Sequence, residues 1–149
     1  MTDTGTADRW GMGQGKDRPM RHRSPPAPLA HFLELYSAGR FWASHEALEE
    51  EWFRTSSDFY QGLILYASAW VHWERRNAHG LRAQSIKALR RLDGYPSAYL
   101  GLDVEALRAH CIDLRDTVWP GFDAWGDVMP MQLTFSPERV LGTETELPG

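Results

Sequence analysis

Apolar residues recur at helical spacing along most of this chain, in segments separated by glycine, proline and short polar turns. The first segment follows Pro28, which suits the first turn of a helix, and Gly39 closes it as a typical C-cap. Asp103 has the character of an N-cap for the last segment. The pattern predicts five helices, over about 28–38, 41–54, 58–77, 81–93 and 104–118. Five helices with short connections favour a single-domain, all-α, antiparallel helical bundle.

The segments outside the predicted helices suggest how the chain is organised. Residues 1–26 are polar and glycine-rich and are expected to form a disordered lead, whereas residues 27–120 form the bundle domain. Residues 121–149 are predicted to be an irregular, loosely held tail, with one short extended piece at 131–135. His79-Gly80 is expected to interrupt the helical pattern, and Gly94-Tyr95-Pro96 to force a loop.

Composition narrows the function classes. The 149 residues carry a formal charge of −4, so nothing favours binding to nucleic acid or to an anionic membrane. The sequence has no apolar run long enough to predict a membrane-spanning helix or a secretory signal. Cys111 is the only cysteine, so neither an internal disulfide nor a cysteine-based metal site is expected. These features predict a cytoplasmic protein. Seven tryptophans indicate an aromatic-rich core, a dimer seam or a ligand-facing wall.

The predicted helix over 41–54 carries a histidine and a carboxylate where apolar side chains are expected. On a helical wheel, His45 and its i+4 neighbour Glu49 lie near the middle of the apolar face, with Glu46 at its margin. Large apolar residues flank the pair: Phe41, Leu48 and Trp52 on one side, Trp42 and Phe53 on the other. Because burying charge is costly unless it is paired, hydrogen-bonded or metal-bound, this pair indicates a site.

The next predicted helix is apolar almost all round, yet its polar residues form one narrow row. Gln61, Ser68 and His72 are spaced i, i+7 and i+11, so antiparallel packing is expected to turn them toward His45 and Glu49. The row can equally be the solvent-exposed edge of its helix, and the His–Glu pair a structural hydrogen bond. The other histidines are interpreted as residues of the lead, the surface or helix ends: His22, His31, His79 and His110.

Two blocks of sequence resemble a known family. The run from Phe41 to Trp52, FWASHEALEEEW, resembles the signature of the domain-of-unknown-function 309 family, and the block from Phe59 to Ile64 with His72 is similar to its second motif. The likeness covers about residues 30–115 and departs from the family pattern at Leu81. It implies a compact helical bundle and, on motif grounds, a metal-dependent hydrolase. The family's polar positions correspond to His45, Glu46, Glu49, Gln61 and His72.

As a metal centre, the cluster would supply two imidazoles and a carboxylate. His45, Glu49 and His72 would bind one divalent transition metal (Zn, Fe, Mn or Ni) and leave a position open for water. Glu46 would act as general base and Gln61 would orient the water or substrate, which gives the metal-dependent hydrolase. The pattern is not the His-Glu-x-x-His of zinc proteases, because Glu49 stands where the second histidine would be.

Two alternative hypotheses for this cluster require no metal. In a ligand-binding module, His45, Glu49, His72 and Trp52 would hold a small polar molecule. In a structural protein, the aromatic residues would form a homodimer seam, and the polar pair would fix the register of two helices without catalytic activity.

Overall fold

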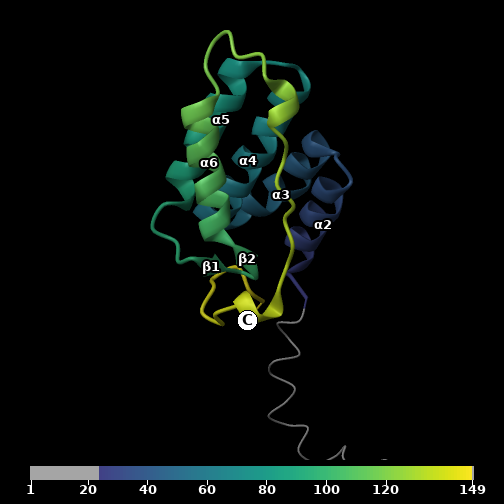
Figure 1. The fold of residues 1–149 in the computed structure, drawn as a ribbon. Coiled ribbons are helices and arrows are strands. Elements are labelled where there is room, and N and C mark those ends of the chain that lie inside the picture. Colours follow the sequence, from purple (N-terminus) through teal and green to yellow (C-terminus); the bar gives the residue numbers. More distant parts are fainter. Residues whose placement is uncertain (1–23, 149) are drawn as a thin grey trace, which may run out of the picture.

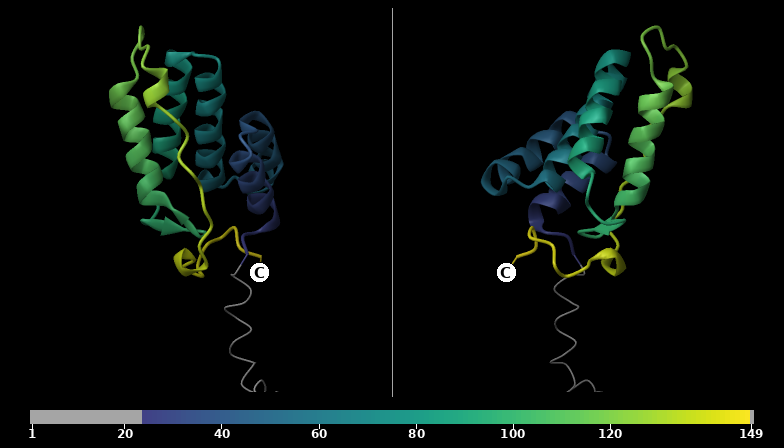
Figure 2. Two further views of the ribbon diagram at one scale, coloured as in Figure 1. Left: turned by 45° about the vertical axis from the view of Figure 1, so that its right-hand side comes forward. Right: turned by 90° about the vertical axis from the view of Figure 1, so that its left-hand side faces the viewer.

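The computed structural model describes residues 24–148, and within them it contains five α-helices. They are α2 (Ala27–Ser37), α3 (Phe41–Thr55), α4 (Asp58–Glu74), α5 (Ala78–Leu92) and α6 (Val104–Thr117). Consecutive helices run antiparallel and pack in chain order, with α4 between α3 and α5, as Figures 1 and 2 show. The predicted all-α antiparallel bundle is therefore confirmed. None of these described helices is long and apolar enough to cross a membrane.

Helix α4 is the centre of the hydrophobic core. Ten of its residues are buried, among them Tyr60, Tyr66 and Trp70 with at most 1% of their surface exposed. The ring of Tyr66 lies against Tyr36 of α2 and against His110 of α6. A helix that is apolar almost all round is expected in the interior of a bundle, so the sequence pattern and the structure agree here.

The junction between α4 and α5 differs from the prediction. Helix α4 ends at Glu74 because Arg76 adopts a left-handed backbone with φ of 55°, and α5 already begins at Ala78. His79-Gly80 therefore lies inside the first turn of α5 and does not interrupt it. The reason is a cap: the side chain of Asn77 accepts a hydrogen bond from the Gly80 amide at 3.0 Å, and this bond starts the helix.

A small antiparallel hairpin joins α5 to α6, where the sequence predicted only a loop. Its strands are β1 (Ala98–Tyr99) and β2 (Leu102–Asp103), connected through Leu100 and Gly101, which both have positive φ. Two left-handed residues in succession are typical of the tight turns that close hairpins. Asp103 then caps α6 by accepting a hydrogen bond from the Ala106 amide, as the sequence predicted.

The C-terminal segment is not a loose tail. After α6 it turns at the top of Figure 1 and runs down the length of the bundle to the hairpin, as the views of Figure 2 also show. The indole of Trp73 donates to the carbonyl of Val128, and Tyr36 donates to that of Met131. The predicted extended piece at 131–135 belongs to this segment but has no strand partner in the described structure.

Glu144 fixes the end of this segment to the hairpin. Its side chain is only 5% exposed and accepts hydrogen bonds from the amides of Leu100, Leu141 and Gly142, at 2.7–2.9 Å. The predicted looseness beyond residue 136 is therefore wrong, because a buried carboxylate with three amide partners holds the chain in place. Of the predicted disordered lead, residues 1–23 lie outside the described structure.

Candidate functional site

The candidate site lies on α3, but α3 is rotated relative to the helical-wheel prediction. Its buried residues are Phe41, Ser44 and Leu48, whereas His45 and Glu49 are only partly buried. The prediction that His45 and Glu49 occupy the middle of the core-facing stripe is therefore wrong. The wheel counted the aromatic residues on both flanks as core residues, but those on one flank face solvent.

Two aromatic side chains of α3 are exposed. Trp42 exposes 55% of its surface and Phe53 exposes 69%. The neighbouring Trp52 is half-buried, packs against the hydrophobic core, and has its ring 4.8 Å from that of Phe53. The aromatic-rich core predicted from the tryptophan content is thus only part of the arrangement, because α3 also presents rings outward.

His45 belongs to this outward side of the helix. Its imidazole stacks on the indole of Trp42, with ring centroids 4.8 Å apart and planes inclined by 14°. The Nδ1 atom of His45 is buried and has no hydrogen-bond partner among the described residues. A ligand or partner would therefore meet the ring through Nε2, since Nδ1 is covered by the protein itself.

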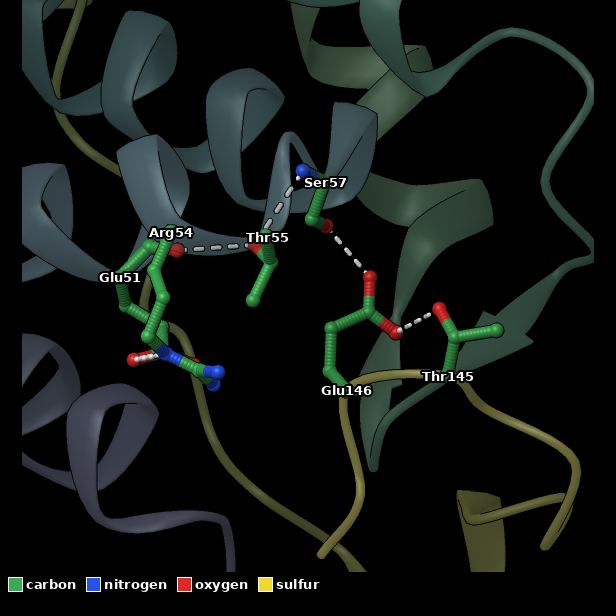
Figure 3. Close-up of polar contacts among 6 residues, drawn as sticks. All are labelled: Glu51, Arg54, Thr55, Ser57, Thr145 and Glu146. Carbon is green, nitrogen blue, oxygen red and sulfur yellow. Dashed lines mark hydrogen bonds and ion pairs between the residues drawn. The ribbon is translucent and has the colours of Figure 1, made fainter.

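Three carboxylates accompany these rings. Glu46, Glu49 and Glu50 have no ion-pair partner within residues 24–148. Glu51 differs, because it is paired with Arg54, whose Nε donates to Oε1 at 3.2 Å. Figure 3 shows that pair at the C-terminal end of α3. The outward side of α3 therefore combines exposed aromatic rings with unneutralised negative charge.

The turn after α3 is tied to the C-terminal segment, which fixes the end of α3. The hydroxyl of Thr55 donates to the Glu51 carbonyl and accepts from the Ser57 amide, while Ser57 in turn donates to the carboxylate of Glu146 (Figure 3). A second oxygen of Glu146 accepts from Tyr99 of the hairpin. These bonds hold the C-terminal end of α3 against the C-terminal segment.

The predicted polar row of α4 is half-buried. Gln61, Ser68 and His72 all have intermediate exposure, so they are neither core residues nor a fully exposed edge. The Oε1 atom of Gln61 is buried and lacks a hydrogen-bond partner in the described structure. No hydrogen bond joins this row to His45 or Glu49 among the residues described.

His72 is positioned by α5. Its Nδ1 lies 3.1 Å from Nδ2 of Asn77, whose Oδ1 already accepts from Gly80, so the amide must donate to the imidazole. The ring lies so close to Gly80 that a Cβ there would come within 2.2 Å of it. Burial, followed by the nearby Arg75 and His79, lowers the pKa of His72, which agrees with a neutral ring that accepts at Nδ1.

The predicted three-residue metal centre is not assembled. The described part of the chain contains no group of three or more His, Cys, Asp or Glu side chains that could hold a metal ion. His45, Glu49 and His72 therefore do not form a ligand set in this structure. His72 contacts Asn77 and Gly80 at the α4–α5 junction, while His45 stacks on Trp42 of α3.

His110 was interpreted from sequence as an ordinary surface or helix-end residue, and this is wrong. It is part-buried, its Nδ1 lies 2.7 Å from the hydroxyl of Tyr66, and its ring stacks on Trp70. Burial lowers the pKa of His110, against a smaller opposing effect of Asp113. Its partners come from α4, so the local sequence carried no signal of this contact.

Part of the bundle matches a known family model. Residues 29–83 match the model of a domain of unknown function, DUF309. The chain contains a DUF309 domain. The match includes nearly all of α2, the whole of α3 and α4, and the start of α5. It is shorter than the likeness over 30–115 expected from sequence, so α6 and the C-terminal segment lie outside it.

The DUF309 domain contains all the residues predicted to form the site. His45, Glu46 and Glu49 lie on α3, and Gln61 and His72 on α4, within the matched region. The family description supplies no activity. No curated protein matches the chain.

Proposed function

We propose that this protein is a binding module that docks a basic, amphipathic segment of a partner protein on the outer side of α3. The surface, called here the α3 face, consists of Trp42, His45, Glu46, Glu49 and Phe53. The observation that carries the proposal is the exposure of two large aromatic side chains, Trp42 and Phe53, on one helix. Exposed apolar groups rimmed by polar ones are typical of interaction sites.

The spacing of the α3 face fits a helical partner. Trp42, His45, Glu49 and Phe53 follow one another at i, i+3, i+7 and i+11, so they form a single stripe along α3. At 1.5 Å per residue, the two aromatic residues lie about 16 Å apart along the axis, or three helical turns. Amphipathic helices dock through anchors with this periodicity, and tryptophan is prominent among the residues that dominate binding energy.

Charge indicates the chemistry of the partner. Glu46 and Glu49 lie between the aromatic anchors, and neither has an ion pair among the described residues. Lysine or arginine side chains of a partner can approach these carboxylates, and they can also stack on the Trp42 indole. A basic segment with apolar side chains therefore satisfies both features of the α3 face.

A second copy of this chain fits the α3 face less well. In a two-fold antiparallel pairing, Trp42 of one copy would lie opposite Phe53 of the other, which is favourable. The same register places Glu46 opposite Glu49 of the second copy, twice over, and like charges in a contact are destabilising. The charge pattern therefore favours a basic partner over the homodimer predicted as one alternative.

The proposal is tested by fluorescence anisotropy with a labelled, helical leucine–lysine peptide as the probe. Trp42→Ala and Phe53→Ser are each expected to weaken binding by about 30-fold, the effect of losing a central anchor. Met129→Ala is the matched control, because Met129 is 63% exposed but lies outside the α3 face. Far-UV circular dichroism of each variant checks that the fold is retained.

Several results would overturn the proposal. A leucine–glutamate peptide that binds as well as the lysine peptide would show that charge is not recognised, and full competition by spermidine would show a simple cation site. A concentration-dependent dimer that is lost in Phe53→Ser would make a second copy the occupant. Elemental analysis tests the metal-dependent hydrolase predicted from the motif: a stoichiometric transition metal lost in His45→Ala would replace the binding module.

A further inference from the structure

A second candidate surface, which shares no residue with the α3 face, is concave and lies on α5. It is a groove of about 400 Å³ between α5 and the loop that follows α6. The lining residues that matter here are Arg82, Ala83, Ile86, Lys87, Arg90 and Trp119. We infer that this groove, called here the α5 groove, binds a planar anionic ligand of the nucleoside polyphosphate class.

Trp119 and Arg82 form a stacking platform in the α5 groove. Trp119 exposes 54% of its surface, and its indole nitrogen donates to the carbonyl of Asp116 at 3.1 Å. The guanidinium of Arg82 lies over the ring, 4.4 Å from its centroid, and is anchored by a hydrogen bond from Nε to the Arg115 carbonyl at 3.0 Å. Both groups are thus fixed before any ligand binds, which reduces the entropic cost of stacking an aromatic ring there.

The groove is positively charged along its length. Arg82, Lys87 and Arg90 line it, and no aspartate or glutamate belongs to the lining. Lys87 and Arg90 have no ion-pair partner among the described residues. Asp116, on the loop side, accepts two hydrogen bonds of 2.8 and 3.3 Å from Arg115, and its carboxylate also interacts electrostatically with Arg82. The charges of Lys87 and Arg90 are therefore available to an anionic ligand.

The separation of these groups sets the size of the ligand. Arg82, Ile86 and Arg90 follow one another at i, i+4 and i+8, so they form one row on α5. Lys87 and Arg90 lie about 8 and 12 Å along the helix from Arg82, at 1.5 Å per residue. A free phosphate cannot reach the platform and the distal cations together. A planar base joined through a sugar to a chain of phosphates spans this distance.

The middle of the groove is apolar. Ala83 and Ile86 lie between Arg82 of the platform and the distal cations along α5, and they contribute small or aliphatic side chains. Such a floor suits the sugar and the edge of a base, which are less strongly hydrated than phosphate. The groove volume also falls within the range usual for small-molecule sites. The inference does not depend on the α3 face, because no residue is shared between the two surfaces.

Isothermal titration calorimetry of the full chain with ATP, adenosine and inorganic tripolyphosphate tests the inference. ATP is expected to bind more tightly than either fragment, with an affinity that falls as salt is raised. Arg82→Gln and Trp119→Ala should each weaken ATP binding at least tenfold, whereas Arg91→Gln should not. Arg91 is the matched control because it is the adjacent arginine of the same helix, pairs with Asp58 and does not line the groove.

Each contrary outcome has a clear meaning. Tripolyphosphate binding as tightly as ATP would reduce the groove to a general anion patch, and equal weakening by Arg91→Gln would place the binding elsewhere. No heat of binding at millimolar ATP, with the fold confirmed by circular dichroism, would also overturn the inference. The peptide assay on Trp42 and Phe53 is unaffected by any of these results.

Discussion

Replacement of Gly80 by alanine tests whether His72 is held by packing. In the interior of a helix this substitution is ordinarily favourable by up to about 1 kcal/mol. Here the added Cβ would lie 2.2 Å from Nδ1 of His72 and 2.4 Å from Cγ, whereas ordinary contacts begin at 3.4 Å. The imidazole must therefore move back by more than an ångström, and this movement breaks its 3.1 Å hydrogen bond with Asn77.

The net effect is expected to be destabilising. Overpacking costs about 1–3 kcal/mol, and loss of the hydrogen bond adds about 0.5–1.5 kcal/mol. After the gain in helix propensity is subtracted, Gly80→Ala should lower the free energy of unfolding by about 1–3 kcal/mol. For a chain of this length, that corresponds to a fall in Tm of roughly 3–10 °C.

Urea denaturation followed by far-UV circular dichroism measures the effect. The control is Gly126→Ala, because a Cβ at Gly126 meets nothing within 4 Å. Gly80→Ala should change the free energy of unfolding much less when it is made in the His72→Ala background, since the clashing ring is then absent. Gly80→Ala with unchanged or increased stability, or no coupling in the double variant, would refute the packing argument for His72.

Three further predictions concern groups outside the α3 face and the α5 groove. Glu144→Gln should lower the free energy of unfolding by about 1–3 kcal/mol in urea denaturation. Burial acts to raise the pKa of Glu144, but the backbone amides that donate to its carboxylate lower the pKa overall. The stability that Glu144 contributes is therefore present above the pKa of the unfolded state and is lost as pH falls through the pKa of the folded state. Burial raises the pKa of Cys111 to about 12, so iodoacetamide at pH 8 should label it in urea and leave it unlabelled in the folded protein. Burial lowers the pKa of His110, so at acidic pH the unfolded chain binds more protons than the folded one. The free energy of unfolding should therefore decrease as pH is lowered through about 6.5. His110→Phe should lose less stability than the wild type between pH 7.5 and 5.5, and an equal loss would count against this assignment.

The helices and most of their ends could be predicted from the sequence because they depend on interactions a few residues apart. Ser57 and Asp103 cap α4 and α6 through bonds to the amides three residues on, and a side-chain oxygen at that spacing is visible in the sequence. The start of α5 differs from the prediction although its cap is equally local. The glycine after His79 predicts a break, whereas in the structure the Asn77 side chain accepts a hydrogen bond from the Gly80 amide and caps the helix.

The rotation of α3 was decided by tertiary structure. Aromatic residues count as apolar on a wheel whether or not a neighbouring helix covers them, and only the packing of α3 against α2 and α4 leaves Trp42 and Phe53 exposed. The placement of His72 against Gly80 depends in the same way on how α5 returns along α4.

The C-terminal segment shows the limit of local reasoning most clearly. Its polar composition predicted a loose tail, and nothing near Glu144 in sequence indicates that its carboxylate is buried. The Leu100 amide that it binds lies 44 residues earlier, and Ser57, which binds Glu146, lies 89 residues earlier. The sequence by itself determined which segments are helical, because helix formation is governed by local spacing and caps. The tertiary structure decided which side chains are exposed or bound, because burial depends on neighbours that are distant along the chain.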